Sequence, residues 1–88
     1  MGFLALDIGT TNWKAVVFSR QCMPVCSAKR PARTVQGQDG LPYYDPRQVW
    51  DSVVEMIAEI AAHYPLRELA AVSVTSMGEA VVPMGRDG

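Results

Sequence analysis

The groups best suited to chemistry lie in one short polar segment near the start of the chain, DIGTTNWK. Gly9 lets a ligand come close to the backbone because it has no Cβ atom. Thr10 and Thr11 offer hydroxyl groups and backbone N–H donors, and Lys14 adds a cation. Asp7 brings a carboxylate that can hold a metal ion through water. The segment therefore suits a clamp for nucleotide phosphates and Mg²⁺.

The same residues also suit a purely structural turn. Asp, Gly and Asn12 all tolerate left-handed backbone geometry, and Thr is common at the start of a strand. An Asp-x-Gly-Thr segment can therefore simply join the two strands of a hairpin. Turn chemistry alone leaves both interpretations open, and the neighbouring elements must decide between them.

The elements on either side of the segment predict an α/β fold. Three apolar runs with short links indicate an antiparallel β-meander, in which Pro24 restricts the third run to a sheet edge. The expected strands are residues 3–6, 14–18 and 24–28. The first run, FLAL, is continuous, which is typical of a strand covered on both faces. Residues 31–44 lack periodicity and are expected to form an irregular loop, and the basic sequence KRPAR a solvated one.

A single long helix is expected after this loop. Asp45 predicts the N-cap, Pro46 the first helical position, and Gln48 a capping box. An apolar stripe at helical spacing follows and ends before Pro65. Its members are Val49, Trp50, Val53, Ile57, Ile60, Ala61 and Tyr64. Trp50 and Met56 are expected in the core rather than in a ligand pocket.

The next apolar run, residues 70–74, predicts a second buried strand. A strand, a helical crossover and another strand imply a parallel pair with a right-handed connection. If this strand lies beside the first one, Asp7 and residues 75–79 share the carboxyl edge of the sheet, where α/β folds bind ligands. Glu79 then becomes a candidate for hydrogen bonds to a polyhydroxylated substrate. Residues 80–84 are expected to add a hairpin strand before a reverse turn at residues 85–88.

Composition narrows the class of protein. Eighty-eight residues form one domain at most, and the net charge of −1 offers no basis for binding nucleic acid or an anionic membrane. No stretch of 18 apolar residues is present, and Asp7 follows the first apolar run too soon for a signal peptide, so a cytoplasmic location is expected. Cys22 and Cys26 lack partners for a zinc site and are expected to be reduced thiols.

Three segments of the chain resemble the amino-terminal domain of the FGGY carbohydrate kinases. LALDIGTTNWKAVVF is similar to the family's first phosphate motif, and YYDPRQVWDSVVEMI to the entry of its first long helix. AAVSVTSMGEAVVPMGRDG is similar to the strand, substrate loop and hairpin that follow. The resemblance spans essentially the whole chain. The first motif also resembles actin-like and heat-shock chaperone ATPases, but the Asp-Pro-x-x-x-Trp helix start favours the kinases.

The resemblance implies a partial ribonuclease H-like, or actin-like ATPase, domain: residues 1–88 would be the first part of the kinase N-terminal domain. The implied activity is ATP-dependent phosphorylation of a sugar or polyol hydroxyl. The implied cofactors are ATP and Mg²⁺, and a homo-oligomer is left open for the full-length protein. The implied catalytic base lies beyond residue 88, so no residue of this chain is assigned as catalytic and these residues alone are expected to be inactive.

The resemblance also implies roles for individual residues. Asp7 would lie near Mg²⁺, and the turn with Gly9 would hold the ATP phosphates together with Thr10 and Thr11. Lys14 matches the basic residue that reaches the phosphoryl group. The residues that match the positions of sugar contacts are Gly78 and Glu79. Gly78 stands where glycerol kinases carry an arginine, so the sugar is left open.

Two other functions remain as alternatives. An actin-like or chaperone-type ATPase would use the same phosphate turn without a sugar contact. A non-catalytic interaction module would keep the fold and have lost the rest of the kinase. Sugar binding by the full-length protein distinguishes the kinase from the first alternative, and a second ATPase domain downstream distinguishes it from the second.

Overall fold

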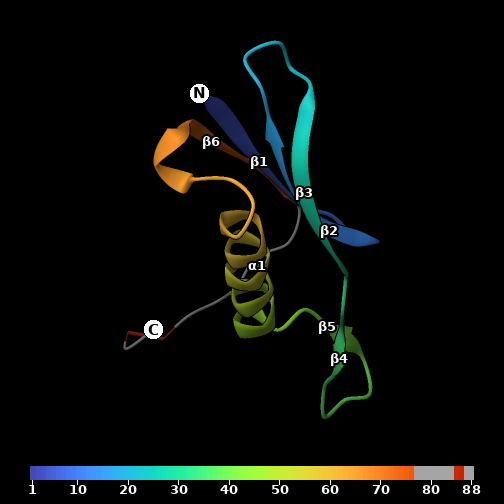
Figure 1. The fold of residues 1–88 in the computed structure, drawn as a ribbon. Coiled ribbons are helices and arrows are strands. Elements are labelled where there is room, and N and C mark those ends of the chain that lie inside the picture. The colour runs from blue at the N-terminus through green and yellow to red at the C-terminus, as the bar shows by residue number, and fades with distance from the viewer. Residues whose placement is uncertain (77–84, 87–88) are drawn as a thin grey trace.

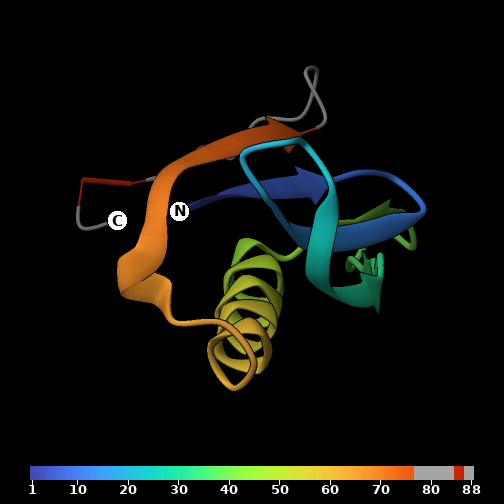
Figure 2. The ribbon, with the colours of Figure 1, turned by 45° about the horizontal axis from the view of Figure 1, so that its top comes forward.

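Four strands form one mixed sheet in the computed structural model, which describes residues 1–76 and 85–86. The strands are β1 (Gly2–Ile8), β2 (Asn12–Phe18), β3 (Pro24–Pro31) and β6 (Leu69–Ser76). Their order across the sheet is β3-β2-β1-β6 (Figures 1 and 2). β1 and β2 pair in antiparallel, as do β2 and β3, whereas β6 runs parallel to β1. The predicted meander, crossover helix and parallel strand are therefore confirmed.

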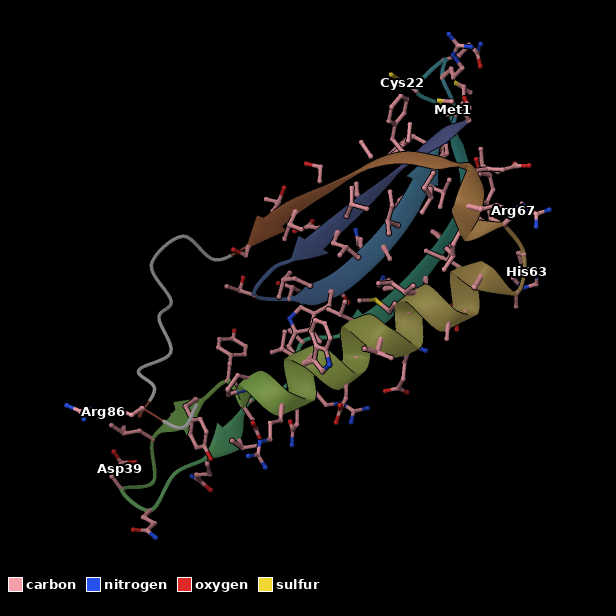
Figure 3. The ribbon with its side chains drawn as sticks, turned by 90° about the vertical axis from the view of Figure 1, so that its left-hand side faces the viewer. Met1, Cys22, Asp39, His63, Arg67 and Arg86 are labelled. Atoms are coloured by element: carbon pink, nitrogen blue, oxygen red, sulfur yellow. The ribbon has the colours of Figure 1, made fainter. Side chains whose placement is uncertain are left out.

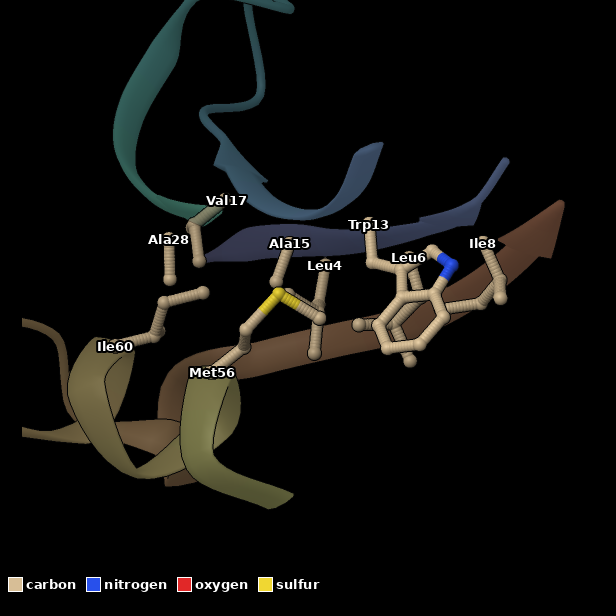
Figure 4. Close-up of a cluster of buried hydrophobic side chains, with 9 residues drawn as sticks. All are labelled: Leu4, Leu6, Ile8, Trp13, Ala15, Val17, Ala28, Met56 and Ile60. Carbon is tan, nitrogen blue, oxygen red and sulfur yellow. The ribbon is translucent and has the colours of Figure 1, made fainter. Parts of the chain in front are cut away.

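One face of this sheet carries the core. Burial alternates along β1 and β2, so every second side chain points toward the helix. The buried side chains from the three meander strands are Leu4, Leu6, Ile8, Trp13, Ala15, Val17 and Ala28 (Figure 4). Phe3, on the other face, is 40% exposed. The prediction that the first strand is covered on both faces was therefore wrong for the described residues.

The helix α1 (Pro46–Ala61) begins where the sequence predicts. The Asp45 carboxylate accepts a hydrogen bond from the backbone N–H of Arg47 at 3.0 Å, and Pro46 occupies the first turn. The predicted capping box is not formed among the described residues, because no hydrogen bond joins the Gln48 side chain to the Asp45 backbone. The cap therefore consists of Asp45 alone.

The buried stripe of α1 is narrower and shorter than predicted. Met56 and Ile60 are fully buried against the sheet (Figure 4). Trp50 is 66% exposed, so its predicted place in the core was wrong. One residue advances a helix by about 100°, which turns Trp50 away from the sheet when Val49 packs against it. The helix ends at Ala61, and a short 3₁₀ helix, η1 (Leu66–Glu68), leads into β6.

The segment between the meander and the helix is more ordered than predicted. β4 (Val35–Gln36) and β5 (Pro42–Tyr43) form a small antiparallel ribbon at the lower end of the molecule in Figure 1. The Asp39 carboxylate accepts a hydrogen bond from the N–H of Leu41, and Gly40 adopts a left-handed φ of 82°. A side chain that mimics a backbone turn and a left-handed glycine together close this ribbon.

The strand β3 starts at Pro24, as expected of an edge strand, but it runs on to Pro31. Lys29 and Arg30 therefore lie within the sheet, opposite Lys14 and Trp13 of β2. The prediction that this basic sequence is a solvated loop was wrong for these two residues. Because neighbours along a strand point to opposite faces, Lys29 and Arg30 serve different sides of the sheet.

The parallel strand β6 is exposed rather than buried. Val72 and Val74 lie beside Leu4 and Leu6 of β1, yet 56% and 63% of their surfaces are accessible. The reason is the position of α1, which packs against β2 and β3. The prediction of a buried strand was therefore correct in position and wrong in burial for the described residues.

Two predicted features fall where the structure gives no description. The expected strand at residues 80–84 and the candidate residues Gly78 and Glu79 lie outside the described residues. Within the described part of the chain, no helix is long and apolar enough to cross a membrane.

Candidate phosphate-binding site

A three-residue turn joins β1 to β2 and forms the floor of a pocket. The turn is closed by a hydrogen bond of 3.3 Å from the Gly9 N–H to the Asn12 carbonyl oxygen. The open pocket above it has a volume of about 230 Å³. Its lining residues are Asp7, Gly9, Thr10, Thr11, Asn12 and Lys14. All five phosphate-site residues that the sequence singled out therefore line one pocket, and Asn12 joins them.

The pocket opens on the sheet face that α1 leaves uncovered. Asp7 lies directly opposite Lys14 on β2 and opposite Thr75 on β6. Lys14 in turn lies opposite Lys29 on β3. Residues that are directly opposite in a sheet point to the same face. A polar row of Lys29, Lys14, Asp7 and Thr75 thus crosses all four strands beside the pocket.

The charges of this row are exposed to solvent. Asp7, Lys14 and Lys29 are all exposed. The ion pair in the described part of the chain joins Arg30 Nη2 to Glu59 Oε1 on α1, at 3.4 Å on the opposite face. No ion pair with a described residue occupies the ammonium groups of the row, so an anion can reach them from solvent.

Gly9 provides the space that the pocket needs. A Cβ atom placed on Gly9 would lie 3.3 Å from the Asn12 carbonyl oxygen and 3.7 Å from Asp7 Oδ1. The first distance is tighter than an ordinary contact, and the second puts a methyl group beside the carboxylate. Among the described residues, the left-handed φ values belong to Cys22 and Gly40. The turn therefore joins two strands without the left-handed backbone of the structural alternative, and it needs glycine for space.

Three hydrogen bonds hold the turn in place. Besides the bond between Gly9 and Asn12, the N–H of Ala32 donates to the Thr11 carbonyl oxygen at 3.0 Å. The indole Nε1–H of Trp13 donates to the Gly9 carbonyl oxygen at 3.1 Å. Trp13 and Asn12 were not among the site residues predicted from the sequence. The signal in the sequence that could have indicated Trp13 is an aromatic side chain with an N–H donor on the buried side of β2.

The carboxyl ends of β1 and β6 share one edge of the sheet, as the sequence predicted. Ile8 lies opposite Ser76, and Asp7 opposite Thr75. Figure 3 shows this edge at the end of the sheet away from Met1 and Cys22. β6 therefore ends at Ser76 on the same edge of the sheet as the pocket. The positions of Gly78 and Glu79 lie outside the described part of the chain.

The donor set at this edge suits Mg²⁺ bound together with phosphates. No group of three or more His, Cys, Asp or Glu residues that could cage a metal ion occurs among the described residues. Asp7 contributes a single carboxylate. Mg²⁺ usually keeps several waters and is bound through one or two carboxylates plus substrate phosphates. One exposed carboxylate beside a phosphate-sized pocket fits that pattern.

Comparison with known proteins identifies the relatives of this chain. The model of the N-terminal domain of the FGGY family of carbohydrate kinases matches residues 2–88. The glycerol kinase of Desulfitobacterium hafniense is 35% identical over 81 residues, which cover 90% of this chain. The aligned part is 16% of that protein, so the chain spans about one sixth of the length of this relative.

Solved structures agree with the sequence comparison. A gluconate kinase from Lactobacillus acidophilus matches 86% of this chain and 15% of its own, with a TM-score of 0.73 and 26% identity. A xylulose kinase from Rhodospirillum rubrum matches 88% of this chain and 16% of its own, with a TM-score of 0.71 and 28% identity. The arrangement of strands and helix is therefore that of sugar kinases.

Proposed function

Because this chain belongs to the FGGY family of carbohydrate kinases, we propose that it supplies the phosphate-binding turn of an enzyme that transfers a phosphoryl group from ATP to a hydroxyl of a sugar or polyol. The observation that carries the proposal is that Asp7, Gly9, Thr10, Thr11 and Lys14 line one pocket at the carboxyl edge of β1. The activity is proposed for the full-length gene product.

The turn is suited to charge neutralisation rather than to covalent chemistry. Phosphoryl transfer passes through a loose transition state whose charge is spread over the phosphate oxygens, so positioning and electrostatics dominate catalysis. The Thr10 and Thr11 N–H groups and hydroxyls donate hydrogen bonds to those oxygens. Lys14 adds a positive charge from the neighbouring strand. Mg²⁺ bound with ATP would supply further neutralisation, and Asp7 would hold it through water.

The sugar is proposed to bind beside this pocket, where β6 ends. Gly78 and Glu79 are the candidate contacts to its hydroxyl groups, on the basis of their match to the family motif. A carboxylate base that accepts the substrate proton is needed as well. We place it beyond residue 88 and assign no residue of this chain to that role.

The proposed substrates also favour a location. ATP and small sugars meet in the cytoplasm, and we propose that the protein acts there.

A substrate panel on the full-length gene product tests this function. With ATP and Mg²⁺, we expect at least one sugar or polyol to be phosphorylated. The variant Asp7→Ala should lower kcat/KM by about 10- to 100-fold, the range seen when a group that orients a metal ion through its outer shell is lost.

Two outcomes would contradict the proposal in different ways. Hydrolysis of ATP with no sugar phosphorylated would favour the actin-like ATPase alternative. Full kinase activity in Asp7→Ala would remove Asp7 from the metal site while leaving the kinase assignment intact.

A further inference from the structure

We propose that Trp13 is a positioning residue for phosphate binding, because its indole N–H fixes the orientation of the peptide group between Gly9 and Thr10. The proposal rests on the proposed function, which makes the β1–β2 turn a phosphate site. The role of Trp13 would be to aim a backbone donor, without contact between its own ring and the phosphate.

The Trp13 ring lies in the core and reaches the turn with its N–H group. Trp13 is fully buried, with an exposed fraction of 0%, and lies on the same side of β2 as Ala15 and Val17 (Figure 4). Its Nε1–H donates to the Gly9 carbonyl oxygen at 3.1 Å, a normal length for such a bond. The Gly9 carbonyl is therefore held toward the face of the sheet that α1 covers.

Peptide geometry then determines the direction of the Thr10 N–H. A trans peptide group is planar, and its C=O and N–H bonds point in opposite directions. If the Gly9 carbonyl points toward the covered face, the N–H of Thr10 points toward the open face. That is the face on which Asp7 and Lys14 lie and onto which the pocket opens. Trp13 thus directs the Thr10 donor into the pocket.

Two backbone N–H groups of the turn remain available for a ligand. The Gly9 N–H is bonded to Asn12 within the turn, and the Thr11 carbonyl accepts from Ala32. No hydrogen bond to a described group occupies the N–H of Thr10 or of Thr11. The turn is therefore anchored through its other backbone groups and keeps two donors for a ligand. A rigid donor loses less entropy on binding than a mobile one, so anchoring raises affinity for phosphate.

The variant Trp13→Phe tests this role in the full-length gene product, because it keeps an aromatic ring in the core and removes the N–H. A misdirected donor costs about one hydrogen bond, so we expect the KM for ATP to rise about 3- to 10-fold. The KM for the sugar should change by less than about twofold. The matched control is Met56→Leu, a volume-conserving change in the same core that leaves the Gly9 bond in place. It should alter neither KM.

The outcomes separate this inference from the proposed function. An unchanged KM for ATP in Trp13→Phe, or equal changes in both KM values, would overturn the positioning role while the kinase assignment stands. If the unmodified protein phosphorylates no sugar, the proposed function fails, and the dissociation constant of ATP measured by titration carries the test instead. A protein that binds no ATP would overturn both.

A second measurement needs no variant, so it tests the proposal even if the Trp13→Phe protein does not fold. In the unmodified protein, the indole N–H resonance of Trp13 should exchange slowly with solvent and should shift when ATP and Mg²⁺ are added. An indole N–H that exchanges rapidly, or a resonance that ATP leaves unmoved, would contradict the proposal.

Discussion

Gly9 is the residue at which the geometry of the site is most restricted. Its neighbours leave little room for a side chain, because a Cβ atom would meet the Asn12 carbonyl oxygen at 3.3 Å and stand 3.7 Å from Asp7 Oδ1. Its backbone φ is not left-handed, so other residues could adopt its conformation. Glycine is therefore required here because a side chain lacks space, and not because of the backbone conformation.

The variant Gly9→Ala should consequently impair ATP binding more than folding. We expect the KM for ATP to rise about tenfold. That factor corresponds to a loss of about 1.4 kcal/mol of binding free energy, which the crowded methyl group would cause. The melting temperature should fall only slightly. Steady-state kinetics and thermal unfolding of the same preparation check both expectations.

Gly40 offers a matched control, because its substitution should affect stability and not ATP binding. It lies in the ribbon of β4 and β5, has a φ of 82°, and has open space around it. The variant Gly40→Ala should lower stability by about 1 kcal/mol, because a side chain at this φ is strained, and should leave the KM for ATP unchanged. Equal effects of the two substitutions on ATP binding would contradict the role of Gly9.

At the scale of elements, strand register brings together charges that are far apart in the sequence. Lys29 of β3 lies opposite Lys14, which lies opposite Asp7. Adjacent strands are about 4.8 Å apart, so the long Lys29 side chain can lean over Lys14 toward the pocket. Arg30 points to the other face, where it contacts Glu59 of α1. The edge strand β3 therefore adds a cation to the side where phosphates are proposed to bind.

The substitution Lys29→Ala should weaken ATP binding about two- to fivefold at low ionic strength, and the effect should shrink as salt is added. Arg30→Ala removes the same charge from the neighbouring position and serves as its control, with no expected change in ATP affinity. Titrations at two salt concentrations check this. Equal losses in the two variants, or a loss that salt does not reduce, would show that Lys29 does not act through its charge at the pocket.

The elements themselves were largely predictable from the sequence, whereas their burial was not. The cap at Asp45, the helical stripe and the apolar runs are local signals, and they placed α1 and the four strands of the main sheet. The exposure of Trp50 depends on which face of α1 meets the sheet, and the exposure of Val74 depends on where α1 crosses it. Local patterns encode neither. The ribbon of β4 and β5 was missed because each of its strands is only two residues long.

The candidate site was predictable to a similar extent. The five predicted residues that line the pocket could be singled out because their chemistry is concentrated in one segment. The roles that we propose for Trp13 and Lys29 could not be predicted, because they depend on a hydrogen bond across the turn and on the register between strands. The side-by-side placement of β1 and β6 was predicted correctly, since a helical crossover strongly favours a parallel neighbour.

At the scale of the whole molecule, α1 covers one face of the sheet and leaves the other face open. α1 and the core occupy one side of the sheet, and the polar row with its pocket occupies the other. Trp13 connects the two, because it belongs to the core and bonds to the turn. Apolar side chains of β6, among them Val72 and Val74, remain exposed on the covered side beyond the reach of α1. The core of the described residues thus lies directly behind the turn that lines the pocket.

The central claim is that the β1–β2 turn binds the phosphates of ATP. The most direct test is a crystal structure of the full-length gene product with a non-hydrolysable ATP analogue and Mg²⁺. We expect phosphate oxygens within about 3 Å of the Thr10 and Thr11 backbone nitrogens, with Asp7 joined to the metal through water. Phosphates bound elsewhere, with this turn open to solvent, would contradict it.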